Sequence, residues 1–351
     1  MYKRLIYQAR IVTHGWCVKV QLSGGMIMGA NLLEVNNLSA GFSTNKGNFQ
    51  VLTEISFTLK AGEALGIVGE SGCGKSVTAL SIMGLLPYLG KVTQGNIYFE
   101  GNDLLTLKDK EMQKIRGNNI AMIFQDPITA LNPVHTIGDQ IAEAIMIHKK
   151  VSKKAAMVQA IDALRLVMIP MPELRLKEYS YQMSGGMSQR IMIAMALSCN
   201  PRILLADEPT AALDVTTQSQ IIDLMIKAKE ELGTAIIFIS HNLGVIAEMA
   251  QRVAVMYAGR IVELSYSSDI FEDALHPYTE GLLKSMPGIH NGGKEKLHVI
   301  NGSVPHPMNM PAGCPFHPRC PYMLDICKER TPNLVAVTRE HYVSCWKVDA
   351  K

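Results

Sequence analysis

A glycine-rich octapeptide carries the strongest chemical signal in the sequence. Residues 69–76 fit the pattern G-x-x-x-x-G-K-[ST] at every fixed position, in the order Gly69, Glu70, Ser71, Gly72, Cys73, Gly74, Lys75, Ser76. In such a loop the backbone N–H groups converge on phosphate oxygens, the lysine adds a positive charge, and the hydroxyl supplies a ligand for Mg²⁺. An apolar run precedes the loop and a helix-compatible run follows it. We therefore expect this loop to bind a nucleotide.

Two adjacent carboxylates, Asp207 and Glu208, follow the apolar sequence ILLA. Parallel α/β sheets bind their ligands at the carboxyl ends of the strands, which is where this pair would lie. We expect Asp207 to hold Mg²⁺ together with Ser76, and Glu208 to orient or deprotonate the water that attacks a γ-phosphate. A solvated pair or a helix cap is the structural alternative, which the neighbouring glycine loop disfavours.

Three further polar sites are placed where they would complete a nucleotide site. Ser184, Gly185 and Gly186 precede a helix-like stretch, and the N-terminus of a helix can receive an anion. Gln125 and His241 each end an apolar run, so both should emerge at the same sheet edge as the glycine loop. We predict that both take part in catalysis and that Gln125 is also a ligand of Mg²⁺.

The elements that must position these residues alternate along the chain. Between Asn132 and Met183 strand-like runs vanish, and stretches such as 139–168 have the composition of helices. The pattern predicts an α/β fold of the P-loop type, with a parallel sheet core and a helical insertion at about 132–183. The runs that have the length and composition of strands buried on both faces are 64–69, 120–124, 202–207 and 234–240.

The composition excludes several classes of protein. The chain has 351 residues, of which 48% are hydrophobic, enough for one large or two ordinary domains. Its 34 basic and 31 acidic residues leave a net charge of +3, which argues against a dedicated nucleic-acid-binding protein. No apolar stretch approaches the ~18 residues that a membrane-spanning helix needs. Any work at a membrane would therefore require a partner protein.

Cysteine and proline residues gather near the C-terminus. The odd total of seven cysteines and the scatter of the first three are typical of a reducing compartment and not of a disulfide framework. We predict that the last four converge on a metal ion or cluster, although their spacing lacks the C-x2-C pairs typical of structural zinc. These four follow the pattern C-x5-C-x6-C-x17-C: Cys314, Cys320, Cys327 and Cys345.

Together these motifs resemble the nucleotide-binding subunit of ABC transporters, from Leu32 to the C-terminus. The resemblance implies that GESGCGKS is the Walker A motif, MIFQDP the Q-loop, MSGGM the signature, ILLADE the Walker B motif, AALD the D-loop ending at Asp214, and His241 the switch histidine. In that family two such domains close head to tail around two ATP molecules. The signature residues 184–186 would therefore contact ATP held by a second subunit.

Longer stretches are similar to the oligopeptide/dipeptide/nickel importer branch of the family: IRGNNIAMIFQDPITALNPVHTIGDQI, MSGGMSQRIMIAMAL, VAVMYAGRIVE and GCPFHPRCP. This similarity implies an ATP-hydrolysing subunit on the cytoplasmic side of the inner membrane, bound peripherally. Its partners would be a second, non-identical ATPase subunit, two transmembrane permeases and, indirectly, an extracytoplasmic solute-binding protein. The similarity also implies a 4Fe-4S cluster on the four cysteines, with zinc or unliganded thiols as the alternatives.

The family usually stacks the adenine ring on an aromatic residue before Walker A. We assign this role to Phe42, with Phe49 as the second candidate and a core phenylalanine as the alternative. Three positions depart from the family pattern: Met187 replaces Gln, Ala211 replaces a hydroxyl residue, and Asn242 replaces Asp. None of them is a catalytic candidate, so the resemblance still implies ATP hydrolysis.

We expect three regions in the chain: a poorly structured N-terminal extension (1–31), a nucleotide-binding domain (32–265) and a Cys/Pro-rich C-terminal extension (266–351). Two competing functions are a soluble ABC ATPase acting on ribosomes or DNA and a redox-sensing ATPase. Members of the first class have two nucleotide domains, or a zinc module or long coiled coil inserted in one. The sequence has none of these features, which favours a transporter.

Overall fold

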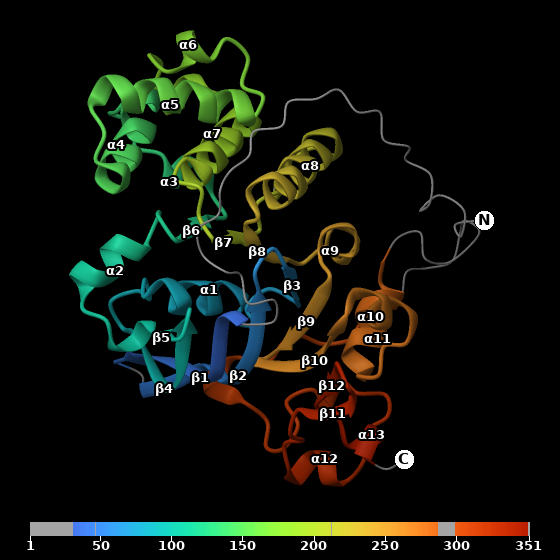
Figure 1. Ribbon diagram of the computed structural model, residues 1–351. Helices are drawn as coiled ribbons and strands as arrows, with labels where there is room; N and C mark the ends of the chain where they lie inside the picture. The colour runs from blue at the N-terminus through green and yellow to red at the C-terminus, as the bar shows by residue number, and fades with distance from the viewer. Residues whose placement is uncertain (1–30, 46, 212, 287–298, 350–351) are drawn as a thin grey trace. The chain divides into compact units, whose positions relative to one another are not determined.

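An eight-stranded sheet forms the centre of the fold, in the order β11-β12-β10-β9-β3-β8-β7-β6 (Figure 1). The computed structural model describes residues 31–349 apart from 46, 212 and 287–298, so the predicted extension 1–31 lies outside it except for Asn31. The four predicted buried strands are confirmed, and every residue in them is buried. They are β3 (Ala64–Val68), β6 (Ile120–Ile123), β7 (Ile203–Asp207) and β8 (Ala235–Ser240), which run parallel with one another and with β9 (Arg252–Tyr257).

Helices cover both faces of the parallel part of this sheet, which is why every residue of β3, β6, β7 and β8 is buried. On one face α1 (Lys75–Met83) packs between the eight-stranded sheet and a second, four-stranded antiparallel sheet. The helices α8 (Val215–Leu232) and α9 (Leu243–Met249) belong to the core on the other face. The site candidates lie at the ends of β3, β6, β7 and β8, at one edge of the parallel strands.

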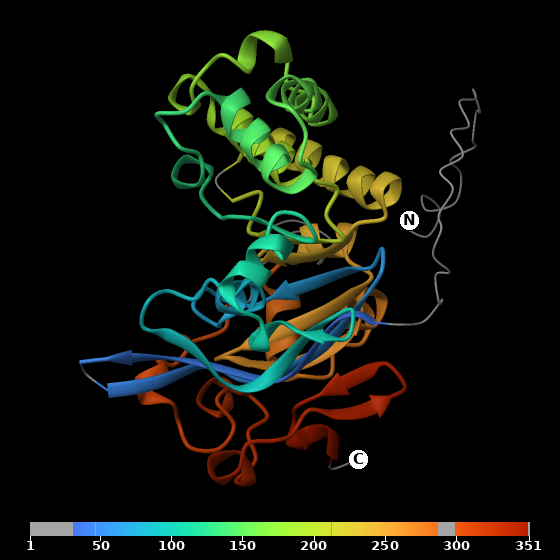
Figure 2. The same cartoon turned by 60° about the vertical axis from the view of Figure 1, so that its left-hand side comes forward.

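The four-stranded sheet was not predicted from the sequence beyond its first residues. Its order is β2-β1-β4-β5, and Figure 2 shows its two longest strands extending past the rest of the chain. From Ile55 to Leu59 buried and more exposed residues alternate in the period of two that a half-buried strand requires. The strands are β1 (Asn31–Thr44), β2 (Gly47–Lys60), β4 (Gly90–Phe99) and β5 (Asn102–Asp103).

The segment between Asn132 and Met183 forms helices and turns, as predicted, with one isolated bridge from Thr136 to Tyr179. The hydroxyls of Thr136 and Ser152 cap two of the helices, and Lys150 ends the first of these in a left-handed conformation. Within the described residues no helix is long and apolar enough to cross a bilayer. The helices within this segment are α4 (Ile137–Lys149), α5 (Lys153–Leu166) and α6 (Pro172–Arg175). Before it lie α2 (Asp109–Ile115) and α3 (Pro127–Ala130), and after it lies α7 (Gly185–Leu197).

The C-terminal part of the chain is more than the loop-rich appendage that its prolines suggest. Its hairpin, β11 (Val335–Thr338) and β12 (His341–Val343), pairs with β10 (Arg260–Tyr266) and so extends the main sheet. The prolines correctly predict irregular structure in residues 305–321, but they do not predict the strands that follow. The helices of this part are α10 (Ser267–Glu272), α11 (Pro277–Lys284), α12 (Ile326–Glu329) and α13 (Trp346–Asp349).

The buried carboxylate of Glu263 links the β11–β12 hairpin to β10 of the main sheet. Glu263 on β10 is fully buried, and its oxygens lie 2.7 Å from Nε2 of His341 and accept from the backbone N–H groups of Leu275 (2.8 Å) and His276 (3.1 Å). Burial alone would raise the pKa of Glu263, but these hydrogen bonds hold it below its ordinary value. The carboxylate is therefore ionised and stabilising at neutral pH.

Replacing Glu263 with Ala is expected to lower the free energy of unfolding by about 3–5 kcal/mol, because it leaves three buried partners unsatisfied. Since the pKa of Glu263 is lowered in the folded state, its stabilising contribution is present above the unfolded pKa of about 4.5 and is lost as the pH falls through the folded value. Urea unfolding at neutral and acidic pH measures both effects. Glu272→Ala, at an exposed position on α10, is the matched control, and equal stability of the two variants would contradict the prediction.

Candidate functional site

The glycine loop joins the end of β3 to the start of α1. Gly69 and Gly74 have φ angles of +155° and +105°, which side chains with a Cβ rarely adopt. A Cβ atom at Gly69 would also lie 2.2 Å from the carbonyl oxygen of Met256. The ammonium of Lys75 is buried and donates to the carbonyl oxygens of Gly69 (2.8 Å) and Glu70 (3.1 Å). The loop thus holds its own cation at the position expected for phosphate binding.

Ser76 and Asp207 meet beside the loop, as predicted. Oγ of Ser76 donates to Oδ1 of Asp207 at 3.0 Å. Burial raises the pKa of Asp207, the nearby carboxylate of Glu208 raises it further, and Ser76 and Lys75 lower it. Two hard oxygen donors, one of them a partly desolvated carboxylate, are the kind of group that Mg²⁺ prefers. These residues therefore fit a magnesium ion.

Glu208 lies between the two other predicted catalytic residues. Its Oε2 accepts from Nε2 of Gln125 at 3.2 Å and lies 3.3 Å from Nδ1 of His241. The backbone of Glu208 has φ +47°, a conformation that costs a residue with a Cβ about 1–3 kcal/mol and is found mainly at functional sites. Its N–H donates to the carbonyl oxygen of Ile239 (3.0 Å), which fixes this conformation.

A cavity of about 470 Å³ opens beside these groups. Four segments far apart in the sequence supply its polar lining, and Asp207 of the Ser76–Asp207 pair directly precedes the lining residue Glu208. The arrangement can hold a charged phosphate chain near a carboxylate that is positioned to accept a proton. The predicted site residues that line the cavity are Gly69, Glu70, Ser71, Gln125, Glu208 and His241.

The signature residues and Asp214 do not line this cavity. Ser184 caps α7 by accepting from the N–H of Met187 (3.3 Å), and both Ser184 and Gly185 are exposed. Asp214 caps α8 in the same way, accepting from the N–H of Thr217 at 2.9 Å. The free N-terminus of α7 thus faces solvent in the single chain, where a second subunit can reach it.

The aromatic candidates for adenine stacking lie in a cavity of their own. Phe42 and Phe49 stack on each other with ring centroids 5.9 Å apart, and both line a space of about 330 Å³. Neither lines the cavity at the glycine loop. The assignment of Phe42 therefore remains a prediction.

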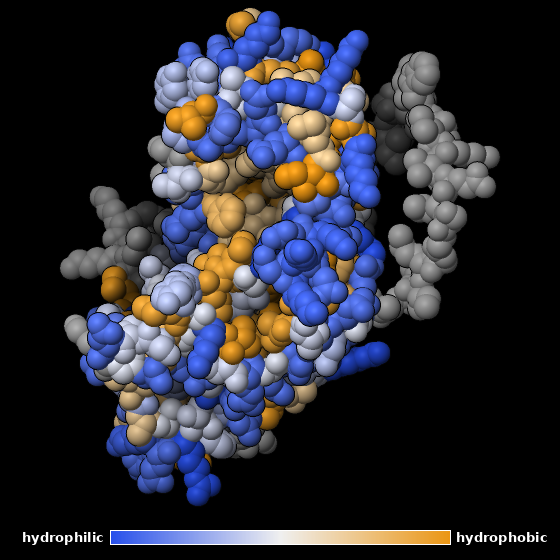
Figure 3. Space-filling view, turned by 90° about the vertical axis from the view of Figure 1, so that its left-hand side faces the viewer, coloured by the Kyte–Doolittle hydropathy of each residue, from blue (hydrophilic) through white to orange (hydrophobic). Residues whose placement is uncertain are grey.

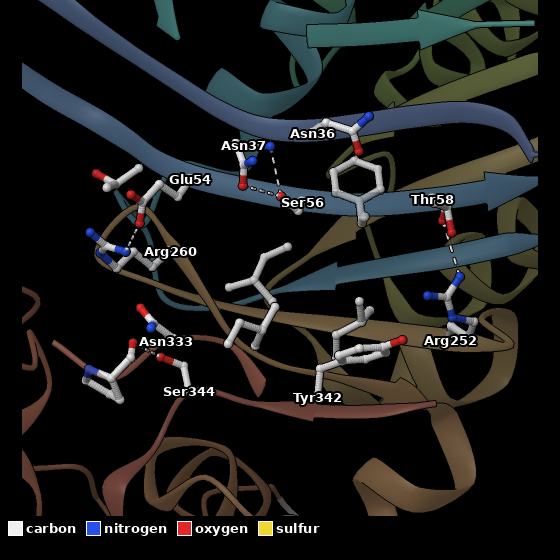
Figure 4. Close-up of a pocket in the computed structure, with 16 residues that line it drawn as sticks. Asn36, Asn37, Glu54, Ser56, Thr58, Arg252, Arg260, Asn333, Tyr342 and Ser344 are labelled. Atoms are coloured by element: carbon white, nitrogen blue, oxygen red, sulfur yellow. Dashed lines mark hydrogen bonds and ion pairs between the residues drawn. The ribbon is translucent and has the colours of Figure 1, made fainter. Parts of the chain in front are cut away.

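A larger cavity, of about 540 Å³, lies between β2 and the C-terminal hairpin (Figure 4). It contains the ion pair of Arg260 with Glu54 (2.9 Å), and Arg252 donates to the carbonyl oxygen of Thr58 (3.3 Å). None of the residues assigned above to nucleotide binding or catalysis lines it. Its size alone does not make it the catalytic site.

The four cysteines lie near one another, but a metal site is not confirmed. The N–H of Cys314 donates to the carbonyl oxygen of Cys327 at 2.8 Å. Burial raises the pKa of the Cys314 thiol to about 11, and the other three thiols contribute to the rise. Within the described residues, however, no group of three or more His, Cys, Asp or Glu side chains is arranged to hold a metal ion. Neither the predicted 4Fe-4S cluster nor the alternative of a zinc ion is therefore supported by this arrangement.

Two residues that hold the glycine loop were missed in the sequence. The hydroxyl of Tyr278 accepts from the N–H of Glu70 (2.9 Å), and Arg319 pairs with the Glu70 carboxylate at 2.9 and 3.0 Å. Tyr278 stands in no motif, and the stretch GCPFHPRCP, which contains Arg319, does not indicate a contact with the glycine loop. Only the fold brings them to the loop.

Comparisons with known proteins agree with this geometry. Residues 52–211 match the ABC transporter family model, and residues 262–327 match the model of the oligopeptide/dipeptide transporter C-terminal region. The chain is 52% identical to the dipeptide transport ATP-binding protein DppD of Bacillus subtilis, over 91% of this chain and 96% of that protein. It is 50% identical to the probable peptide ABC transporter ATP-binding protein y4tR of Sinorhizobium fredii, over 90% and 95% of the two chains.

Solved structures give the same result. A dimeric, post-hydrolysis structure of the ATP-binding cassette MJ0796 with ADP and phosphate matches with a TM-score of 0.61 and 28% identity. The match covers 67% of this chain and 98% of that one. The fold, the arrangement of the catalytic groups and these relatives lead to one conclusion. The chain belongs to the ABC transporter family, among the ATP-binding proteins that carry the oligopeptide/dipeptide transporter C-terminal region.

Proposed function

We propose that this chain is the ATP-hydrolysing subunit of an importer for di- or oligopeptides, or for a related small solute such as nickel. The observation that carries the proposal is the placement of Glu208, whose Oε2 is held by Gln125 and His241 beside the Ser76–Asp207 pair. The identities of 50–52% to peptide and dipeptide transport proteins support the class of cargo. No observation here favours ribosomes or DNA as partners.

In the proposed reaction each part of the site has one task. The N–H groups of residues 69–76 and the ammonium of Lys75 bind the phosphates, and Glu208 accepts the proton of the attacking water while His241 keeps its carboxylate in place. Ser76, Asp207 and Gln125 would hold Mg²⁺, which neutralises phosphate charge when bound.

A second ATPase subunit would supply the opposite half of each nucleotide site. The exposed N-terminus of α7, with Ser184, Gly185 and Gly186, carries two of the features that anion binding needs: free N–H groups and the positive end of a helix. We infer a non-identical partner, as in the branch that the chain resembles.

The permease would dock on the face that carries α2, at the cytoplasmic side of the inner membrane. Figure 3 shows apolar side chains gathered in the middle of this face, below the helical insertion. The segments after α1 and β6 bear exposed apolar side chains, among them Tyr88, Phe124 and Val134. Because Gln125 follows Phe124 directly, a permease seated here would sense the state of the catalytic site. The solute-binding protein would act through that permease.

We propose a 4Fe-4S cluster on the four cysteines, as in the branch that the chain resembles. Such a cluster takes four cysteine thiolates, each at a different iron, so the thiols need not converge on one point. Burial raises the pKa of the Cys314, Cys320 and Cys345 thiols, and neighbouring thiols raise it further. Binding would displace their protons, as metal binding to thiols does.

Purification of the intact membrane complex under anaerobic conditions tests the proposal. Two permeases, a second ATPase chain and peptide-stimulated ATP hydrolysis are the expected result, with about four iron and four sulfide per chain. Co-purification with ribosomes or DNA would contradict the transport function. Zinc in place of iron, or no metal, would contradict the cluster while leaving the transport function intact.

Replacing Phe42 with Ala is expected to raise the Kd for ATP about fivefold, because stacking contributes on the order of 1 kcal/mol. Equilibrium binding to the full chain measures this change, and Phe49→Ala is the comparison because the two rings share one cavity. A larger loss in the Phe49 variant would transfer the adenine contact to that residue. No loss in either variant would remove this cavity from the nucleotide site.

A further inference from the structure

Glu70, the second residue of the glycine loop, is held at three points. Its N–H donates to the hydroxyl of Tyr278, its carbonyl oxygen accepts from Lys75, and its carboxylate accepts from both terminal nitrogens of Arg319. Tyr278 and Arg319 are 208 and 249 residues away in the sequence. The C-terminal part of the chain therefore contacts the loop directly, and through Glu70 it also contacts the phosphate-binding lysine.

Arg319 has one well-defined position. Its side chain is only 6% exposed, its Nε donates to the carbonyl oxygen of Asn301 (2.9 Å), and its Nη2 also donates to that of Ile300 (3.2 Å). The same guanidinium lies 5.7 Å from the ring centre of Tyr257. The two-pronged contact with a carboxylate needs the planar fork of arginine, which lysine does not have.

The short segment that carries Arg319 is itself anchored in the core. Phe316 is 2% exposed and packs edge-on against the ring of Tyr257, with centroids 5.1 Å apart, and against Tyr278 at 5.4 Å. The segment begins at Cys314 and ends at Cys320, immediately after Arg319. The packing of Phe316 in the core therefore holds the segment that carries the Arg319 guanidinium in place.

The contact between Arg319 and Glu70 matters for nucleotide binding because the Glu70 carboxylate is negatively charged. Glu70 lines the cavity at the glycine loop, and an unpaired carboxylate there would repel a phosphate chain at short range in a partly desolvated site. We propose that Arg319 is a positioning residue for ATP binding, which neutralises Glu70 and fixes the first turn of the glycine loop. The C-terminal region thereby sets the affinity of the site. The inference rests on the proposed placement of ATP in this cavity.

Binding of a fluorescent ATP analogue to the full chain tests the inference. Arg319→Gln is expected to raise the Kd about tenfold, within the usual range for coupling between neighbouring sites. In the assembled transporter the KM for ATP rises to a similar extent while kcat at saturating ATP stays within about twofold, because the catalytic groups are untouched. Arg330→Gln, at an exposed arginine of the same region, is the matched control and should bind like the unaltered chain.

A second substitution separates charge from structure. Adding Glu70→Gln to the Arg319→Gln chain removes the unpaired carboxylate and is expected to restore most of the lost affinity, a rescue that a purely structural role would not give. Arg319→Lys keeps the positive charge without the fork, so its Kd should lie between those of the unaltered chain and Arg319→Gln, and this variant serves if Arg319→Gln fails to fold. Unchanged Kd values, or no rescue in the double variant, would overturn the inference. If instead Lys75→Ala bound the analogue normally, the proposed nucleotide site would fail.

Discussion

Replacing Glu208 with Gln is expected to slow ATP hydrolysis by the assembled transporter about 10²- to 10⁴-fold, the usual contribution of a general base. The glutamine amide has nearly the same shape and can still bond to Gln125 and His241, but it cannot accept the proton of the attacking water. The groups assigned to phosphate and Mg²⁺, Lys75, Ser76 and Asp207, are unchanged. ATP binding should therefore stay within about threefold of normal, and the ATP-bound dimer should accumulate.

Phosphate release and size-exclusion chromatography with ATP measure the two effects. The matched control is Glu248→Gln, the same substitution at an exposed position on α9, shortly after His241. If Glu208→Gln retained more than a tenth of the normal rate, the proton would have another acceptor. The contacts of Oε2 would then serve only to stabilise the structure.

The parallel strands and the helical insertion were predictable because their signals are local. Strands that are buried on both faces must be apolar throughout, and the runs 64–69 and 234–240 have this composition. The antiparallel strands are harder to predict, since only one face of β2 is buried and its alternation begins only at Ile55. The C-terminal hairpin is held by the contact between Glu263 and His341. These residues are far apart in the sequence, so local patterns could not predict the contact.

The catalytic site was predictable to the same extent. Lys75, Asp207 and Glu208 stand in motifs whose chemistry is set by residue type and spacing, and the strand ends bring them together. Tyr278 lies outside any such motif, and the stretch GCPFHPRCP around Arg319 does not indicate a contact with Glu70, so both contacts required the structure. The partner-facing role of the signature is still a prediction, because a single chain contains only one half of each proposed site.

Replacing Gly185 with Asp is expected to abolish hydrolysis by the dimer, with a loss of about 10²-fold or more, while the single chain folds and binds nucleotide normally. Gly185 is the first residue of α7, it is exposed, and a Cβ atom there would meet nothing within 4 Å. An acidic side chain in the first turn even favours the helix. In the closed dimer, however, the same carboxylate would occupy the place proposed for the partner's phosphates and repel them.

Two controls make this outcome specific. Lys154→Asp adds an acid to the first turn of α5, at an exposed position in the same helical region, and should leave hydrolysis unchanged. Gly185→Ala adds only a methyl group, so its loss should be intermediate. Normal turnover by Gly185→Asp would mean that the N-terminus of α7 does not face a phosphate chain. If the isolated variant instead lost its own ATP binding, the signature would belong to the pocket of its own chain, and hydrolysis would not require a second subunit.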